Sequence, residues 1–213
     1  MVLLPAILLA VGGTFPLWPA SHWQTSPVND DAQLIDDALK GQSAAFGHLV
    51  TRYQDRLYHS MVQVLGSAED ARDVVQDAFV QAFIKLRTFQ GSSAFYTWLY
   101  RIAFNLAVSS RRRRKPTQSI DQSRESAGEE PADGGAAPSE RLEREELSDQ
   151  VKMALGLLSE EHRAVLVLRE MDGCDYETIS QMLDMPVGTV RSRLHRARMQ
   201  MREQLKAVLQ EDG

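Results

Sequence analysis

The sequence predicts an all-α protein made of two small helical domains joined by a flexible acidic linker. Apolar residues recur every three or four positions on both sides of a polar segment, and no stretch alternates apolar and polar residues as a strand would. The 213 residues, 43% of them hydrophobic, suffice for two modest cores. We expect an apolar N-terminal extension, a first domain, a linker and a second domain, at residues 1–28, 29–115, 116–140 and 141–213.

The N-terminal extension contains no Asp, Glu, Lys or Arg, and it is nearly all apolar up to Val11. A secretory signal would begin with positive charge, and a membrane helix would need about 20 apolar residues without interruption by Pro5, Pro16 and two glycines. We expect a disordered tail or a wrongly assigned start, with Val28 as a plausible true start. A membrane anchor is the alternative.

Four amphipathic helices are expected in the first domain. Two lie between Asp30 and Leu65, with a break near Gly41, and their inner face includes Leu34, Ile35, Ala38, Leu39, Phe46, Leu49, Val50, Tyr53 and Leu57. The third begins at Ser67, a good N-cap, and buries Val75, Ala78, Phe79, Ala82 and Leu86. The fourth buries Phe95, Leu99, Ile102, Ala103 and Leu106 and stops before Pro116.

The linker carries most of the negative charge of the chain. Residues 116–140 hold no aromatic residue and one large aliphatic, Ile120, so they cannot bury enough apolar surface to offset their conformational entropy. Residues 116–150 contain ten acids and three bases, an excess of seven negative charges in a chain whose net charge is −5. Charge is therefore partitioned along the sequence.

The second domain ends in a helix-turn-helix pattern. One helix follows the N-cap Ser159 and is broken by Gly173, and the next is capped by Asp175. The last helix opens at Pro186. Apolar residues line the facing sides of the last two helices, namely Ile179, Leu183, Val190, Leu194 and Ala197. In this motif the first helix braces the second, which enters the DNA major groove.

The last helix carries a concentrated positive strip. Residues 186–202 hold five arginines, one histidine and no acid. Arg191, Ser192, His195 and Arg196 share the side opposite the apolar face, and arginine can pair with guanine edges or phosphate. A solvated surface is the simpler interpretation, but like charges at this spacing repel unless a polyanion is present, which favours nucleic acid.

A second basic cluster, Arg111, Arg112, Arg113, Arg114 and Lys115, ends the fourth helix. Trp98, Arg101 and Asn105 share one face of that helix, and exposed aromatics beside a basic surface are typical of single-stranded DNA binding. Cations also cap helix C-termini, and Tyr96, Trp98, Tyr100 and Phe104 could equally be core residues. Both interpretations stay open on the chemistry alone.

Composition and motifs give little support for an enzyme. Cys174 is the single cysteine, and the five histidines never fall at metal-ligand spacing. There is no Gly-rich phosphate loop, no nucleophile elbow and no cluster of His and carboxylates. We expect no catalytic residue, no metal, no cofactor and no small-molecule substrate, and a reducing cytoplasm as the compartment.

Three segments follow one another across a variable linker: DARDVVQDAFVQAFIKL, SSAFYTWLYRIAFNLAVSSRRRRK and LSEEHRAVLVLREMDGCDYETISQMLDMPVGTVRSRLHRAR. Together they resemble the extracytoplasmic-function (ECF) group of the sigma-70 family, near the sigma-E type. The match covers roughly residues 30–115 and 141–208. The resemblance implies region two in the first domain and region four in the second.

The resemblance also implies roles for particular residues. Asp73, Gln76 and Asp77 would dock on the beta-prime clamp helices of core RNA polymerase. Asn105 would read a base flipped from the non-template strand of the minus-ten element, with Trp98, Arg101 and Tyr96 nearby and the basic cluster on phosphate. The minus-thirty-five element would be read by Arg191, Ser192, His195 and Arg196, with Thr189 and Arg193 on the same helix.

The partners implied are core RNA polymerase, through its clamp helices and beta flap, promoter DNA and an anti-sigma factor, in the bacterial cytoplasm. The function implied is promoter recognition and melting for a stress or envelope-response regulon. Two alternatives stay open: a stand-alone helix-turn-helix regulator, which would bind duplex DNA without polymerase, and an all-helical adaptor, which would give no DNA-dependent signal.

Overall fold

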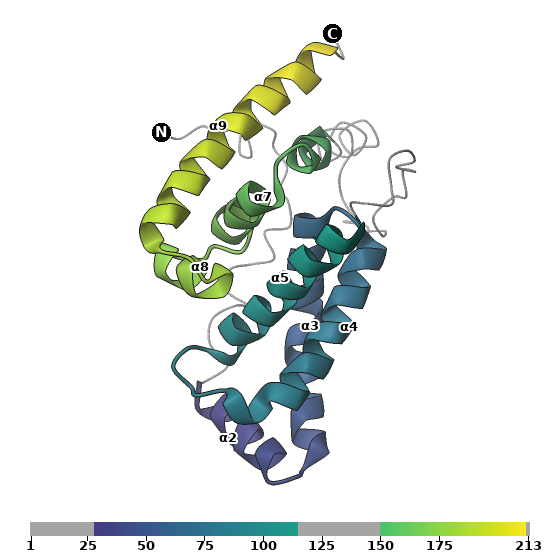
Figure 1. Cartoon of the computed structure of the whole chain (residues 1–213), viewed down its shortest axis with the longest axis vertical. Coiled ribbons are helices and arrows are strands. Elements are labelled where there is room, and N and C mark those ends of the chain that lie inside the picture. The colour runs from purple at the N-terminus through teal and green to yellow at the C-terminus, as the bar shows by residue number, and fades with distance from the viewer. Residues whose placement is uncertain (1–27, 115–149, 212–213) are drawn as a thin grey trace, which may run out of the picture.

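A computed structural model describes residues 28–114 and 150–211 of the chain. Every regular element in these two ranges is helical, which confirms the all-α prediction. The elements form two helical units, an N-terminal domain and a C-terminal domain (Figure 1). The expectations for the N-terminal extension, the linker and Lys115 fall outside the described residues.

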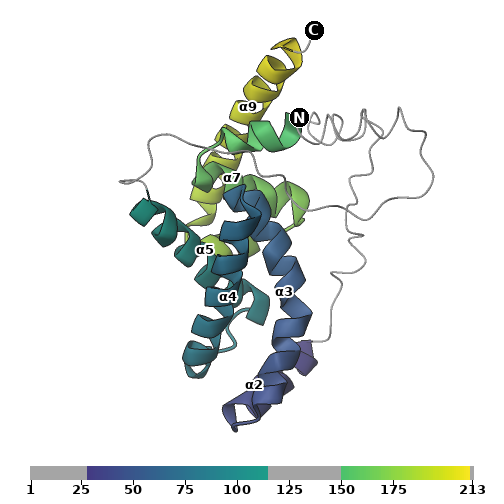
Figure 2. The same ribbon diagram turned by 90° about the vertical axis from the view of Figure 1, so that its right-hand side faces the viewer.

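The N-terminal domain contains α2 (Val28–Leu39), α3 (Ser43–Leu65), α4 (Ala68–Lys85), the 3-10 turn η2 (Leu86–Thr88) and α5 (Phe95–Arg114). Ser67 caps α4 as expected, since its hydroxyl accepts a hydrogen bond from the amide of Asp70 at 3.2 Å. Gly66 ends α3 with φ of 73°, a conformation that glycine adopts without strain. This tight turn places α3 and α4 side by side (Figure 2).

The core of the N-terminal domain lies between α3, α4 and α5. Its fully buried members include Leu49, Leu57, Met61, Ala78, Phe95 and Leu99. The predicted inner faces are largely confirmed, with one correction: Leu39, assigned to the inner face of its helix, is 40% exposed. It is the last residue of α2, where the helix leaves the core.

The C-terminal domain contains a helical stretch at 150–156, then α7 (Glu160–Leu166), the π-helical turn η3 (Val167–Met171), α8 (Tyr176–Leu183) and α9 (Val187–Glu211). Ser159 and Asp175 cap α7 and α8, as predicted, by accepting bonds from the amides of His162 and Thr178. The apolar face of α9 is buried, as predicted, at Val190, Leu194 and Ala197.

The two domains pack directly against each other. α8 lies along α5, and α7 and η3 approach α3 (Figures 1 and 2). Buried apolar side chains form one continuous cluster that includes residues of both domains. Among the described residues, no helix is both long enough and apolar enough to cross a membrane.

Candidate nucleic-acid interface

The turn between α8 and α9 has a fixed local geometry. Asp184 ends α8 in the left-handed conformation, with φ of 52°, which aspartate tolerates better than most residues. Ser180 closes the turn by donating from Oγ to the carbonyl oxygen of Met185 at 2.6 Å. The carbonyl of Pro186 then accepts bonds from the amides of Thr189 and Val190 at 2.8 and 3.1 Å. The helix-turn-helix expected from the sequence is present.

The cap of α8 is charge-assisted. The carboxylate of Asp175 accepts from the amide of Thr178 at 2.7 Å. The bonds that Thr178 donates hold the pKa of Asp175 below its usual value, with a smaller contribution in the same direction from Arg169. The orientation of α8 is therefore secured at its first turn, which positions the turn that leads into α9.

α9 presents the predicted base-reading residues to solvent. Arg191, Ser192, His195 and Arg196 are all exposed, and they lie opposite the buried stripe of the same helix. We call these four residues the α9 reading set. Ser192 also donates to the carbonyl of Thr189 at 3.0 Å, and the guanidinium of Arg191 lies 5.7 Å from the ring of Tyr176.

Two other arginines of the positive strip are paired inside the domain. Arg193 Nη2 lies 2.8 Å from Glu161 Oε2, and Arg198 Nε donates to Glu170 Oε1 at 2.9 Å. The positive strip therefore lacks compensating acids only within its own stretch of sequence. Arg193 is also partly buried, as is Thr189, so the structure presents both of them to a ligand less fully than it presents the α9 reading set.

The predicted minus-ten residues on α5 are in unequal positions. Arg101 and Asn105 are exposed, whereas Trp98 is partly buried and packs on Phe89 and Phe95, with ring centroids 5.2 and 5.8 Å apart. Tyr96 is only 4% exposed. Its ring is covered by the guanidinium of Arg56, 3.9 Å from the centroid, so in this arrangement it offers no face on which a base could stack.

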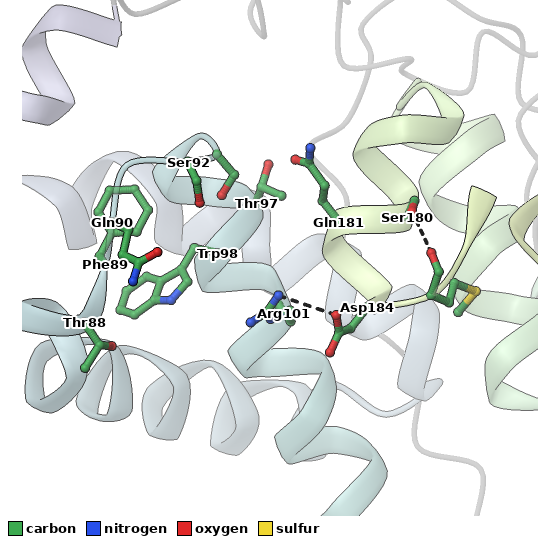
Figure 3. A pocket seen from close by; sticks show the side chains of 12 residues that line it. Thr88, Phe89, Gln90, Ser92, Thr97, Trp98, Arg101, Ser180, Gln181 and Asp184 are labelled. Carbon is green, nitrogen blue, oxygen red and sulfur yellow. Dashed lines mark hydrogen bonds and ion pairs between the residues drawn. The ribbon is translucent and has the colours of Figure 1, made fainter.

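Arg101 and Asn105 border two different hollows. Asn105 lines a shallow one of about 180 Å³ between α4 and α5, together with Gln81 and Lys85. Arg101 and Trp98 line an open cleft of about 640 Å³ whose opposite wall is α8, with Ser180, Gln181 and Asp184 (Figure 3). Arg101 Nη1 lies 3.6 Å from Asp184 Oδ1 across that cleft.

The basic cluster at the end of α5 is described only as backbone. The helix continues through Arg114, so the cluster extends the same rod that carries Asn105. The side chains of Arg111, Arg112, Arg113 and Arg114 lie outside the description, as does Lys115. Their assignment to phosphate stays a prediction.

The predicted polymerase-docking residues lie on the outer face of α4. Asp73, Gln76 and Asp77 are exposed, and the same face continues into three exposed apolar side chains. Val80, Phe83 and Ile84 are 52%, 51% and 67% exposed. We call these six residues the α4 outer face. Sequence reasoning missed its apolar half, because apolar residues lie on both sides of the second half of α4 and the periodicity there is weak.

Polar groups are buried where the two domains meet. Ser60 of α3 donates to Asp172 Oδ2 at 2.8 Å, and Arg163 of α7 donates to the carbonyl of Val64 at 3.0 Å. Arg163, only 3% exposed, also donates to the carbonyls of Gly156 and Leu158 at 2.7 and 3.1 Å. We call the contacts of Ser60 with Asp172 and of Arg163 with Val64 the domain junction. No residue of the junction was singled out from the sequence.

Burial shifts the titration of groups around the junction. It raises the pKa of Asp172, an effect opposed by the hydrogen bond from Ser60 and by Arg56. It raises the pKa of Cys174 to about 12, with Asp172 adding to the effect. The pKa values of Tyr96 and Tyr100 are raised chiefly by burial and secondly by Asp172. The thiol and both phenols are therefore neutral at physiological pH.

Comparison with known proteins identifies the class to which these two domains belong. The family description "Sigma-70 region 2" matches residues 49–117, and "Sigma-70, region 4" matches residues 148–201. The chain is 42% identical over 176 residues to the ECF RNA polymerase sigma-E factor of Escherichia coli K12, covering 79% of this chain and 90% of that one. It is 37% identical over 186 residues to the RNA polymerase sigma-H factor of Pseudomonas aeruginosa, covering 85% and 96%.

Two solved structures share the fold. The sigma factor RpoE of Bartonella quintana, in complex with the anti-sigma factor NepR, superposes with a TM-score of 0.59 at 26% identity, over 76% of this chain and 96% of that one. CnrH, in complex with the cytosolic domain of CnrY, superposes with a TM-score of 0.58 at 30% identity, over 86% and 99%.

These matches define a bacterial transcription initiation factor with regions two and four of the sigma-70 type. The chain belongs to the sigma-70 family of RNA polymerase sigma factors, within its extracytoplasmic-function group. Its function is therefore promoter-specific initiation of transcription. The family resemblance inferred from the sequence is confirmed.

Proposed function

We propose that the chain joins core RNA polymerase through the α4 outer face, reads the minus-thirty-five element with α9 and melts the minus-ten element with α5. It acts as a non-enzymatic subunit in the cytoplasm and serves a stress or envelope-response regulon. The observation that supports the proposal best is the exposure of all four members of the α9 reading set on a braced helix-turn-helix, because base edges are read only by side chains free to enter the groove.

The α4 outer face suits a partner that is basic at one end of the contact and apolar at the other. Asp73 and Asp77 complement a basic surface, which speeds association and fixes register. Ile84 and its apolar neighbours would leave water on binding, and burying an exposed isoleucine is worth about 1.5–3 kcal/mol. Exposed apolar clusters of this kind mark protein interaction sites.

The docking role is tested with Ile84→Asp, because Ile84 is 67% exposed and its replacement leaves the core intact. The proposal expects affinity for core polymerase to fall by at least ten-fold, measured by fluorescence anisotropy of the labelled chain. The matched control is Leu39→Asp, which makes the same kind of change at an exposed apolar residue at the end of α2 and should leave the affinity unchanged. Equal affinity of both variants would overturn the assignment.

Asn105 is positioned to read an unpaired base. It is exposed on α5 beside the shallow hollow formed with Gln81 and Lys85. Flipping a base costs a few kcal/mol of stacking, which contacts in such a hollow would offset. Asn105→Ala should impair open-complex formation more than initial promoter binding, and unchanged permanganate reactivity of the promoter bubble would refute the role.

An anti-sigma factor is the expected regulator. Both solved structures described above are complexes of a sigma factor with a second protein, in one case named as an anti-sigma factor. Exposed apolar side chains at Met153 and Leu157 of the C-terminal domain, 54% and 64% exposed, give such a partner a place to bind.

The stand-alone regulator makes a different prediction from the sigma factor. It would bind promoter duplex by itself through α9, and α5 would be unused. Electrophoretic mobility shift with and without core polymerase separates the two: the sigma proposal expects promoter-specific binding only in the presence of core enzyme.

A further inference from the structure

Arg191 differs from Arg193 and Arg198 in the kind of contact that it makes inside the C-terminal domain. The latter two are paired with carboxylates of other elements. No carboxylate in the described part of the chain is paired with Arg191, whose guanidinium lies over the ring of Tyr176, 5.7 Å from the centroid. An ion pair neutralises the cation and occupies its N–H groups. Contact with a ring face leaves both the charge and the donors available to a ligand.

The start of α8 places Tyr176 beside Arg191. Tyr176 is the first residue of α8 and follows Asp175, whose carboxylate accepts from the amide of Thr178 at 2.7 Å and fixes that end of the helix. The Tyr176 side chain is partly buried and packs against the hydrophobic core. α8 itself packs against α9 (Figure 1). The ring that Arg191 contacts is therefore held by the body of the domain.

A second guanidinium lies over the same ring. Arg169, on the π-helical turn η3, is 5.0 Å from the centroid of Tyr176, and its Nη1 donates to the carbonyl of Cys174 at 2.8 Å. The amide of Asp172 donates to the carbonyl of Val167 at 3.0 Å, which is the π-type bond of η3. Turns of this kind are frequent at functional sites. Tyr176 thus contacts one guanidinium that is anchored on a backbone carbonyl and one that is exposed.

Restricting Arg191 before DNA arrives has a physical advantage. A long exposed side chain samples many rotamers, and an interface that immobilises it loses that entropy on binding. A ring that already contacts the guanidinium reduces this cost. Orientation matters most for a base edge, because a bidentate contact needs the planar guanidinium in one direction, whereas a phosphate accepts a cation from many directions. The contact with Tyr176 therefore favours the reading of a base by Arg191.

We propose that Tyr176 is a positioning residue for promoter recognition. Its ring orients the Arg191 guanidinium toward one base pair of the minus-thirty-five element, and Arg169 anchors the ring. The proposal rests on the proposed use of α9 to read that element. Through this contact the first helix of the helix-turn-helix strengthens the preference for one base pair without touching that base pair itself.

Three variants separate the ring, its hydroxyl and the arginine. Tyr176→Leu removes the ring but keeps an apolar side chain on the core, Tyr176→Phe keeps the ring, and Arg191→Ala removes the guanidinium. The matched control is Tyr58→Leu, the same change at a partly buried tyrosine of α3. Thermal unfolding of each full-length variant checks that the fold is retained.

The test uses holoenzyme reconstituted from the full chain and core RNA polymerase. The probe is a duplex library built on a template that the wild-type chain transcribes, with the upstream element randomised. Sequencing of the bound templates gives the preference for each base pair at each position. Arg191→Ala should lower the preference at one position, which identifies its base pair, and Arg196→Ala should do so at another.

Tyr176→Leu should lower the preference at the Arg191 position by about three- to ten-fold, as the loss of a cation–π contact predicts. It should leave the Arg196 position unchanged. Tyr176→Phe and Tyr58→Leu should keep the wild-type preferences at both positions. The double variant Tyr176→Leu with Arg191→Ala should match Arg191→Ala alone, because the ring acts only through the arginine.

Four results would overturn the role of Tyr176. In the first, Tyr176→Leu keeps the wild-type preferences. In the second, it lowers the preference equally at the Arg191 and Arg196 positions, as general damage to the helix-turn-helix would. In the third, Tyr176→Phe loses as much as Tyr176→Leu, which assigns the effect to the hydroxyl. In the fourth, Arg191→Ala weakens binding uniformly, as loss of a phosphate contact does.

Each of these results leaves the proposed function standing as long as the wild-type holoenzyme prefers particular base pairs in the upstream element. A wild-type holoenzyme without any such preference would instead contradict the proposed use of α9.

Discussion

α5 and α9 are both helices proposed to contact promoter DNA, yet the structure exposes them differently. The α9 reading set is open to solvent, and its helix is braced from behind by α8. On α5, Tyr96 is buried, Trp98 is partly buried and Arg101 faces Asp184 across the cleft. The same helix, α8, supports one reader and covers the other. The difference teaches that a helix-turn-helix leaves its own reading set open, whereas the exposure of residues on α5 depends on a helix from the other domain.

Removing Arg163 should give the largest effect, because it connects α7, α3 and the segment before α7. Arg163→Met leaves the carbonyls of Val64, Gly156 and Leu158 buried without this donor. We expect the free energy of unfolding to fall by about 3 kcal/mol, measured from urea titration. Arg163→Lys keeps the positive charge but loses the planar guanidinium, so its free energy of unfolding should fall between those of the wild-type chain and Arg163→Met. A loss below about 1 kcal/mol would show that the junction contributes little.

Arg196→Ala tests the exposed reader alone. Arg196 belongs to the α9 reading set, so its loss should cost about 1–3 kcal/mol of promoter binding and lower run-off transcription accordingly. Affinity for core polymerase should be unchanged. If Arg196 contacts phosphate instead of a base, the salt slope of DNA binding falls by about one unit and the loss is uniform across sequences. Loss of core binding would contradict the placement on DNA.

Asp175→Ala tests the brace that α8 provides to α9. The N-cap bond to Thr178 would be lost, at a cost of about 1 kcal/mol. The pKa of Asp175 is lowered in the folded chain, so its stabilising effect is present above its unfolded pKa and is lost as the pH falls through the folded one. The difference in melting temperature between wild type and variant should therefore shrink on acidification. A constant difference would contradict the cap.

Asp172 should give the smallest effect, a pH dependence of the contact between the two domains at the domain junction. Its pKa is raised in the closed arrangement, so the neutral carboxyl favours closure and ionisation opposes it. Closure is therefore favoured as the pH falls toward the ordinary aspartate pKa, and weakened as it rises through the shifted one. Tyr96, Tyr100 and Cys174 lie near the carboxyl, and their raised pKa values keep all three neutral between pH 4.5 and 7.

Energy transfer between two dyes, attached at Glu69→Cys on α4 and Lys206→Cys on α9 in a chain with Cys174→Ser, checks this dependence when it is measured from pH 4.5 to 7. Transfer in the wild-type chain should rise as the pH falls. Asp172→Asn, which has no proton to gain, should be flat across the range. A flat wild-type profile, or an unchanged slope in the variant, would assign the pH response elsewhere.

Local signals in the sequence were enough for much of the fold. Ser67, Ser159 and Asp175 were identifiable as caps because an N-cap depends on its own side chain and the next three residues. The faces of α9 followed from helical spacing, since Val190, Leu194 and Ala197 repeat at three to four positions. The α9 reading set was assigned correctly to the exposed side for the same reason.

Contacts between distant residues were not visible in the sequence. Glu161 and Glu170 neutralise Arg193 and Arg198 from other elements, so local counting of charges overstated the free positive strip. The sequence left Tyr96 open between base stacking and core packing, and the guanidinium of Arg56 that covers its ring comes from a distant part of the chain. The junction between Ser60 and Asp172 joins residues 112 positions apart, and no periodicity reports such a pair.

Run-off transcription with core RNA polymerase on a promoter library, followed by sequencing of the active templates, tests the central claim most directly. We expect transcripts from a restricted set of templates that share two sequence elements. These transcripts should disappear when the chain is omitted, and their amount should fall sharply with Arg196→Ala or Asn105→Ala. Transcripts that are independent of the chain, or templates selected without a second, minus-ten element, would contradict it.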